Sequence, residues 1–493
     1  MFETAEIGNK IDKATFRKEA PKVREALLEV QRELAGANLA VLIHIGGVEG
    51  AGKSEIVNLL LEWMDARGIQ VNTISEPTDE ERERPPMWRF WRLLPPKGRI
   101  GIFLGSWYTQ PIVDRTFGRM GGAAFNEALD RIIEFERMLA EEGILVLKFW
   151  MHISKQVQKA RLKNLEKDPK TSWRVTKLDW KFFKRYDDFR AVSEDALRKT
   201  STASAPWRIV EAGDERYRSL AVTKAILEEL RKALAAAKEK SQRPKAPAGR
   251  PKPAETNIVN QLDLGVAISQ KEYDRRLLQH QSELSRLTRR LYEAGRSLTL
   301  VFEGPDAAGK GGAIRRLTSC MDARSYQVIS IAAPTDEERA RPYLWRFWRA
   351  LPRQGRVTIY DRSWYGRVLV ERIEGFCAQE DWQRAYAEIN AFEAQLTDYG
   401  ILLVKFWMAI SQDEQLRRFK DRQVTPYKQY KITEEDWRNR EKWDAYEAAA
   451  CDMIERTSTA AAPWVLVEAN DKNHARIKVL RTVCQTLKQV LKV

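Results

Sequence analysis

The feature that most constrains this chain is an internal repeat, in which the second half follows the first at an offset of 257 residues. The segment Pro77 to Arg82, PTDEER, recurs as Pro334 to Arg339, and 17 of 23 positions are identical from Pro77 to Arg99. The offset holds without a gap from the glycine-rich loop of each half to Asp214 and its partner Asp471. A repeat of this length indicates a duplicated domain rather than a solenoid unit. We therefore expect two tandem domains in this chain of 493 residues.

The two copies are joined by a stretch with the composition of a linker. Lys238 to Glu255 carries four prolines and no large apolar residue, which predicts an exposed, semi-extended segment. We accordingly place a first domain at 1–237, the linker at 238–256 and a second domain at 257–493. In the second domain an amphipathic helix, with leucines at Leu277 and Leu284, precedes the glycine loop and is expected to pack in the core.

Short apolar runs alternate with helical stretches in each half. This alternation predicts an α/β fold, in which a parallel sheet is flanked by helices and ligands bind at the carboxyl ends of the strands. The strands expected in the second half are Leu298 to Phe302, Gln327 to Ile331, Val357 to Tyr360, Leu402 to Trp407 and Trp464 to Val467.

The apolar runs, the N-terminus and the cysteines indicate in which compartment of the cell the protein is expected. No apolar run approaches the ~20 residues that a membrane span needs, and the N-terminus lacks the apolar core of a signal peptide. The four cysteines, Cys320, Cys377, Cys451 and Cys484, are scattered without a C-x-x-C pair. We expect reduced thiols in a cytoplasmic protein rather than a disulfide frame or a zinc site.

The net charge of +15 leaves two classes of partner open. A nucleic-acid binder would explain it, but Lys238 to Lys252 alone has six basic residues and one acid, which is +5. A polyanionic substrate explains the remaining charge as well as nucleic acid does.

The stretch Val301 to Arg316 reads as a strand, a tight glycine turn and a helix start. Such a turn, here Gly304 to Gly309, points backbone N–H groups and the positive end of a helix at one anion. Lys310 adds an ammonium, so the predicted ligand is a phosphate chain. Gly311 stands where a hydroxyl normally holds Mg²⁺, and Asp306 is the nearest oxygen that could replace it.

A second acidic element follows at Asp361, at the end of an apolar strand. Phosphate-loop enzymes place a carboxylate for Mg²⁺ at such a position, and Arg362 and Arg367 then supply guanidinium groups for phosphate oxygens. An isolated Asp-Arg pair would be read as a surface ion pair, but beside a phosphate loop we favour the functional interpretation.

Two further segments have open interpretations. In Pro334 to Arg349, Trp345 and Trp348 could stack a base, although their helical spacing favours core packing, and the arginines could hold a phosphate. The basic span Gln415 to Arg456 predicts a polar helical hairpin that closes over phosphates, with a solvated charged helix as the alternative.

The motifs EGPDAAGKGG, PTDEER, YDRSWYGR and KFWM together resemble the polyphosphate kinase 2 family, and the tandem arrangement resembles its two-domain class. The resemblance implies a P-loop kinase fold with a helical lid in each half, Mg²⁺ dependence, and transfer of a terminal phosphoryl group from inorganic polyphosphate to AMP, giving ADP. It implies that Asp306 and Asp361 bind the metal. The residues alone indicate only Mg²⁺-assisted phosphoryl transfer on a polyanion.

We assign site residues on this basis. The catalytic set is Asp306, Lys310, Asp361, Arg362 and Arg367. Phosphate or nucleotide binding is assigned to Gly304, Ala308, Gly309, Gly311, Gly312, Asp336, Arg341, Arg372, Arg422, Lys428 and Lys431. The expected partners are polyphosphate and AMP or ADP, without nucleic acid or membrane, and a homo-oligomer is left open.

The two halves differ where the chemistry is expected. The first half has a complete phosphate-loop pattern, ending in Lys53 and Ser54, yet it carries Leu104, Gly105 and Gln110 at the positions of Asp361, Arg362 and Arg367. Losing these groups removes a metal ligand and charge stabilisation of the transition state. We expect the first half to be a degenerate domain with a structural or regulatory role.

Two rival functions remain at this point. One is a kinase of the same fold that uses ATP, or acts on another nucleotide such as ADP or GDP. The other is a basic nucleic-acid-binding module, against which stand the charge of the linker and the lack of a recognised nucleic-acid motif.

Overall fold

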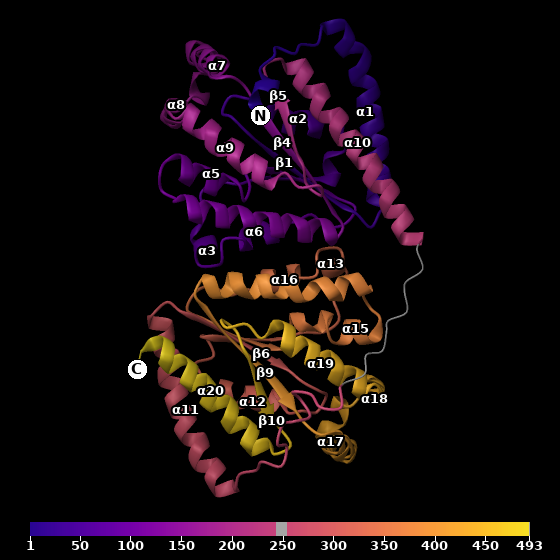
Figure 1. Cartoon of the computed structure of the whole chain (residues 1–493), viewed down its shortest axis with the longest axis vertical. Coiled ribbons are helices and arrows are strands. Elements are labelled where there is room, and N and C mark those ends of the chain that lie inside the picture. The colour runs from indigo at the N-terminus through magenta and orange to yellow at the C-terminus, as the bar shows by residue number, and fades with distance from the viewer. Residues whose placement is uncertain (243–253, 493) are drawn as a thin grey trace. The chain divides into compact units, whose positions relative to one another are not determined.

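The computed structural model describes residues 1–242 and 254–492, and the chain forms two compact units (Figure 1). The first unit contains nearly all of the first half together with Pro334–Arg349, and the second contains the rest of the second half together with Thr78–Pro86. Residues 243–253 of the predicted linker lie outside the described residues. Lys238 to Gln242, predicted to belong to the semi-extended linker, are instead the last residues of helix α10 (Glu215–Gln242). The prediction of an extended segment was wrong for these residues.

Each unit contains one five-stranded sheet in which all the paired strands are parallel. In the first unit the strand order is β2-β3-β1-β4-β5, and in the second it is β10-β9-β6-β8-β7. The strands of the first sheet are β1 (Ala40–Gly47), β2 (Ile69–Thr73), β3 (Ile100–Leu104), β4 (Ile144–His152) and β5 (Trp207–Glu211). Those of the second are β6 (Ser297–Glu303), β7 (Tyr326–Ser330), β8 (Val357–Asp361), β9 (Ile401–Ala409) and β10 (Trp464–Glu468). The predicted α/β fold with parallel sheets is confirmed.

Helices cover both faces of each sheet. In the second unit, α11, α12 and α20 pack on one face and α15, α16 and α19 lie on the other (Figure 1). The longer helices of that half are α11 (Gln270–Glu293), α12 (Lys310–Thr318), α16 (Gln379–Asp398), α17 (Gln412–Val424), α18 (Glu434–Glu441), α19 (Trp443–Thr457) and α20 (Lys472–Leu491). Its short ones are α13 (Asp336–Arg339), α14 (Trp345–Arg349), η4 (Trp364–Arg367), α15 (Val370–Glu374) and η5 (Pro426–Lys431).

The helices of the first half, besides α10, repeat this pattern. They are η1 (Phe2–Ala5), α1 (Lys13–Ala35), α2 (Lys53–Trp63), η2 (Ala66–Gly68), α3 (Asp79–Arg82), α4 (Trp88–Arg92), α5 (Thr109–Thr116), α6 (Gly122–Glu141), α7 (Lys155–Lys167), η3 (Ser172–Arg174), α8 (Lys177–Lys184) and α9 (Tyr186–Thr200). In the parts of the chain that the structure describes, no helix is both long and apolar enough to cross a lipid bilayer.

The apolar pattern of the sequence accounts for the cores. The central strands are buried along nearly their whole length, because helices cover both faces of a parallel sheet. The leucine face of α11 packs into the core of the second unit, as predicted, with Leu284 fully buried. Trp345 and Trp348 are also buried, which confirms the core interpretation over base stacking.

The sheet order places the candidate site. Strand β6 is central and pairs with β8, with Phe302 opposite Asp361. The carboxyl ends of these two strands are therefore adjacent, and the glycine loop that follows β6 lies beside the turn that follows β8.

Candidate active site

The glycine loop of the second unit connects β6 to α12. Gly304 has a backbone φ of +140°, and a Cβ at this position would lie 2.5 Å from the Met408 carbonyl oxygen. Gly309, with φ of +101°, is the N-cap of α12. Both positions require glycine, and the loop presents the N–H groups of a helix start to an anion. Ala308 is buried in the loop, while Gly311 and Gly312 form the first turn of α12.

Lys310 is held inside this loop. Its Nζ donates hydrogen bonds to the carbonyl oxygens of Gly304, at 2.6 Å, and Pro305, at 3.0 Å. Burial lowers the pKa of Lys310 below its ordinary value, and the nearby Arg362 guanidinium adds to this effect. Among the described residues, the hydrogen-bond acceptors of its ammonium are these two backbone carbonyls, which phosphate oxygens can replace.

Asp306 and Arg362 meet across the loop. Arg362 Nη2 donates to Asp306 Oδ1 at 2.6 Å, and Asn439 Nδ2 donates to Asp306 Oδ2 at 3.0 Å. Burial acts to raise the pKa of Asp306, but the charges of Arg362 and Lys310 and these hydrogen bonds outweigh it, so the pKa lies below its ordinary value. Asp306 is therefore a carboxylate near neutral pH.

The backbone on both sides of this pair is strained. Ala307 and Arg362 have left-handed φ angles of +62° and +63°, which are unfavourable for residues other than glycine. Strain of this kind concentrates at functional sites, where the surrounding structure over-determines the backbone. Here it lies on the two segments that form the Asp306–Arg362 pair.

Asp361 ends β8 beside the loop. Within the described residues its carboxylate makes no hydrogen bond or ion pair, while it lies in the electrostatic field of Lys310 and Arg362. Two carboxylates, Asp306 and Asp361, thus belong to one cluster, and carboxylate oxygens suit Mg²⁺. The donor set therefore fits the predicted cation. Arg367, four positions after Ser363, is mostly buried and ion-pairs with Glu371 at 2.9 Å.

Helix α17 contacts the backbone of the glycine loop through two side chains. Gln415 Nε2 donates to the Asp306 carbonyl oxygen at 3.1 Å, and Arg418 Nη1 donates to the Ala307 carbonyl oxygen at 2.9 Å. In the first half Gln158 and Arg161 make the same kind of contact to that half's loop. Gln415 and Arg418 therefore hold the backbone of the loop in place, as Gln158 and Arg161 do in the first half.

The span Gln415 to Arg456 is helical, as predicted, but only part of it resembles a lid. Helix α17 is tied to the loop, and α19 packs in the interior through residues such as Ala449 and Met453. The exposed part is η5 and its flanks, where Arg422 bonds the Lys431 carbonyl oxygen and Lys428 pairs with Asp421 at 2.9 Å. A role of Arg422, Lys428 and Lys431 in phosphate binding stays a prediction.

The other predicted binding residues make their contacts with residues outside the loop. Arg372 is buried, with its Nη1 bonded to Tyr386 Oη at 3.0 Å and Asp452 Oδ2 at 2.8 Å, contacts that favour a structural role. Asp336 and Arg341 belong by their contacts to the first unit, where each pairs within its own segment. Their assignment to phosphate or nucleotide binding stays a prediction.

Sequence reasoning did not assign four polar residues that lie in this region. Glu303 is buried at the end of β6 and accepts a hydrogen bond from Ser363 Oγ at 2.8 Å, and its burial raises its pKa. Asn439 contacts Asp306 directly, and Glu374 and Tyr446 lie next to Asn439 in the hydrogen-bond network. At the 257-residue offset the first half has Gly46, Phe182, Phe117 and Phe189 at the positions of Glu303, Asn439, Glu374 and Tyr446. A position-by-position comparison of the two halves could have identified these residues from the sequence.

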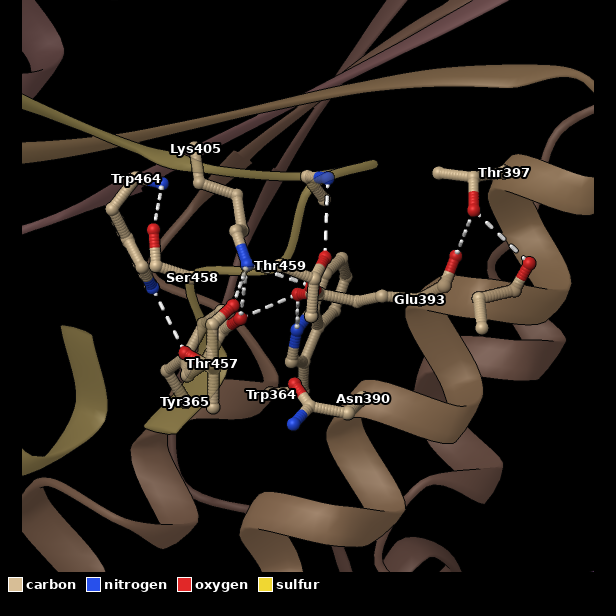
Figure 2. A network of polar contacts seen from close by, with 12 residues as sticks. Trp364, Tyr365, Asn390, Glu393, Thr397, Lys405, Thr457, Ser458, Thr459 and Trp464 are labelled. Carbon is tan, nitrogen blue, oxygen red and sulfur yellow. Dashed lines mark hydrogen bonds and ion pairs between the residues drawn. The ribbon is translucent and has the colours of Figure 1, made fainter. Parts of the chain in front are cut away.

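A buried ion pair fixes the turn that follows Arg362 (Figure 2). Lys405 Nζ lies 2.7 Å from Glu393 Oε2 and also donates to Tyr365 Oη and the Thr457 carbonyl oxygen. Glu393 Oε1 accepts from Trp364 Nε1 at 2.9 Å and from Tyr365 Oη at 2.5 Å. The Ser-Trp-Tyr motif is thus anchored to α16 and β9.

The first half retains this scaffold. Lys148 lies 2.6 Å from Glu136, which also bonds Trp107 and Tyr108. Its glycine loop is present too, but Lys53 is paired there with Glu49 at 2.8 Å. The framework is therefore common to both units, whereas the Asp-Arg cluster belongs to the second.

Comparison with known proteins agrees with this picture. The family model Polyphosphate kinase 2 matches the chain twice, at residues 10–239 and 267–492. A Pseudomonas aeruginosa protein named polyphosphate:AMP phosphotransferase is 54% identical over 493 residues, covering 100% of this chain and 99% of its own. A protein of the same name from Pseudomonas syringae pv. tomato is 50% identical, covering 99% and 98%.

A solved structure extends the likeness to three dimensions. A crystal structure described as a polyphosphate kinase 2 from Pseudomonas aeruginosa superposes with a TM-score of 0.89 at 52% identity, covering 100% of this chain and 99% of its own. The resemblance seen in the motifs is confirmed, and the chain belongs to the polyphosphate kinase 2 family, with one copy of the family's domain in each half.

Proposed function

We propose that this enzyme transfers the terminal phosphoryl group of inorganic polyphosphate to AMP, giving ADP, and that the transfer takes place in the second half. The names of the full-length relatives support the substrates. The observation that carries the location is the cluster of Asp306, Arg362 and Lys310, whose aspartate and arginine have no identical counterpart in the first half.

The side chains of the second half have separable roles in this reaction. Lys310 and the start of α12 bind phosphate oxygens of the transferred group, and Arg362 neutralises charge that develops on them. Asp306 and Asp361 would hold Mg²⁺, which supplies charge neutralisation across the phosphates when bound. Arg367, placed on η4 by the buried Glu393–Lys405 pair, adds a second guanidinium near the turn.

The alternative of the same class is a different donor or acceptor. The donor could be ATP, and the acceptor another nucleotide such as ADP or GDP, because the phosphate loop recognises phosphates irrespective of what they are attached to. Relatives that match about half of the chain are named ADP-polyphosphate phosphotransferase and GDP-polyphosphate phosphotransferase. The full-length relatives favour AMP.

A donor and acceptor assay tests the proposal. Purified enzyme is incubated with Mg²⁺, AMP and either polyphosphate or ATP as sole donor, and ADP is measured by chromatography, with ADP and GDP as alternative acceptors. We expect ADP from AMP with polyphosphate. Turnover with ATP alone, or only with a nucleoside diphosphate acceptor, would contradict the proposal.

We also propose a cytoplasmic location. The four cysteines are all free in the structure, as expected of thiols in a reducing compartment. Measurement of the protein in separated cytoplasmic and membrane fractions tests this, and size-exclusion chromatography with light scattering tests whether it is a homo-oligomer.

A further inference from the structure

A chain of polar side chains runs from Asp306 to the end of α15. Asn439, on α18, donates from Nδ2 to Asp306 Oδ2, so both oxygens of that carboxylate are bound, one by Asn439 and one by Arg362. These two donors come from segments far apart in the sequence, since Asn439 stands 133 residues and Arg362 stands 56 residues after Asp306. Together they fix the plane of the carboxylate.

The orientation of the Asn439 amide is itself determined by its neighbours. The Tyr446 hydroxyl lies 3.2 Å from Asn439 Oδ1 and 3.3 Å from Glu374 Oε1. The hydroxyl carries a single proton, so it donates to one of these two oxygens at a time. The amide oxygen faces this hydroxyl, and the amide nitrogen faces the Asp306 carboxylate. The reversed orientation would place the amide oxygen against a carboxylate, which is repulsive.

Glu374 is the last member of this series of polar side chains, counted from Asp306. Its carboxylate is almost fully buried, and it lies 2.7 Å from Lys442 Nζ and 3.3 Å from Arg438 Nε. Both of these cations belong to α18 or to the residue that follows it, so Glu374 holds this helix against α15. The position of Asn439 relative to the phosphate loop depends on that anchor.

The first half shows that the fold does not need this polar chain. Phe182, Phe117 and Phe189 occupy the matched positions of Asn439, Glu374 and Tyr446. Phe117 and Phe182 pack edge to face at 5.3 Å between ring centroids, and Phe182 and Phe189 lie 6.1 Å apart. Apolar side chains can replace buried polar groups at no cost to stability, so the polar set needs another reason to be present.

We propose that Asn439 is a positioning residue that holds Asp306 in its working orientation, and that Tyr446 and Glu374 orient Asn439. The inference rests on the proposed function, in which Asp306 is a carboxylate of the phosphoryl-transfer site. Partners that orient a ligating group typically contribute a factor of roughly 10 to 100 in metal affinity or activity. An effect of this size is expected from Asn439.

The test compares Asn439→Ala with Tyr446→Phe, with the double variant and with Phe182→Leu at the matched position. We expect Asn439→Ala to lower kcat by roughly 10- to 100-fold and to weaken Mn²⁺ binding, measured without substrate by the electron paramagnetic resonance signal of free Mn²⁺. Tyr446→Phe, which removes a single oxygen, should cause a smaller loss. That loss should disappear when Asn439 is already alanine, because Tyr446 acts through Asn439. Phe182→Leu should leave both quantities unchanged.

Asp306→Asn measured in the same series separates this inference from the function on which it rests. If Asp306→Asn is inactive while Asn439→Ala keeps wild-type kcat and Mn²⁺ affinity, the positioning role is overturned alone. If Asp306→Asn itself behaves as wild type, the site assignment and the inference both fail. Equal losses from Tyr446→Phe in the presence and absence of Asn439 would also overturn the inference. Circular dichroism of each variant identifies unfolding, and Tyr446→Phe keeps the test valid if Asn439→Ala does not fold.

Discussion

Arg362 donates from Nη2 to Asp306 Oδ1 at 2.6 Å, joining the turn after β8 to the loop after β6. The first half has Gly105 at the position of Arg362 and Glu49 at the position of Asp306, so this aspartate–arginine pair is specific to the second half. The contact keeps an arginine and a carboxylate together beside Lys310, where a polyanion and its cation would be bound. The predictions below follow from this cluster and from the matched positions that lack it.

Asp361→Asn should abolish turnover while leaving the fold intact. The carboxylate has no hydrogen bond or ion pair to the described residues, so its removal should not unfold the unit, but it removes one of two negative charges at the predicted cation site. We expect kcat to fall by at least ~100-fold at saturating Mg²⁺. Leu104→Asn, at the matched position, is the control and should retain activity. A wild-type kcat in Asp361→Asn would remove Asp361 from the site.

Asp306→Asn should raise the Mg²⁺ concentration needed for half-maximal activity, or eliminate activity. Gly311→Ser should change this requirement little, because in the proposed site Asp306 would supply the oxygen that a serine supplies in other phosphate loops. A Cβ at Gly311 would meet no atom within 4 Å, so serine fits without rearrangement. Activity is measured across a Mg²⁺ titration of both variants. An unchanged curve for Asp306→Asn would leave this carboxylate with only a structural role.

Lys405→Met should destabilise the second unit. It leaves the buried Glu393 carboxylate without its ion-pair partner, and breaking such a pair by removing one member costs about 3 to 5 kcal/mol. Lys148→Met does the same in the first unit. Thermal unfolding followed by circular dichroism should show a lowered transition in each variant. An unfolding curve that coincides with that of the wild type would show that the network of Figure 2 does not contribute to stability.

The sequence predicted most of the fold because its signals are local and duplicated. The runs around Phe302 and Tyr360 are apolar on both faces, which is typical of strands in a covered parallel sheet, and all five predicted strands of the second half are present. Asp361 and the glycine loop could be placed together for the same reason. Each directly follows a strand, and carboxyl ends of parallel strands share one edge.

The rest of the site depends on contacts between distant positions. Asn439 lies in a polar helix, where only its difference from Phe182 at the matched position of the first half distinguishes it in the sequence. Its contact with Asp306 becomes apparent only from the approach of α18 to the loop. Arg372 is assigned to phosphate or nucleotide binding from the sequence, whereas its partners in the structure, Tyr386 and Asp452, come from two other helices. Arg418 likewise reads as a lid residue in sequence, although it binds the loop's own backbone.

The central claim, that the second half carries the reaction, is tested most directly by one pair of matched variants. Lys53→Ala and Lys310→Ala remove the same ammonium from the two glycine loops. We predict that Lys310→Ala lowers kcat for ADP formation by roughly 10²- to 10³-fold, and that Lys53→Ala lowers it by less than about tenfold, or ~1.4 kcal/mol of activation free energy. Comparable losses from the two variants would mean that both loops turn over, and would contradict the account.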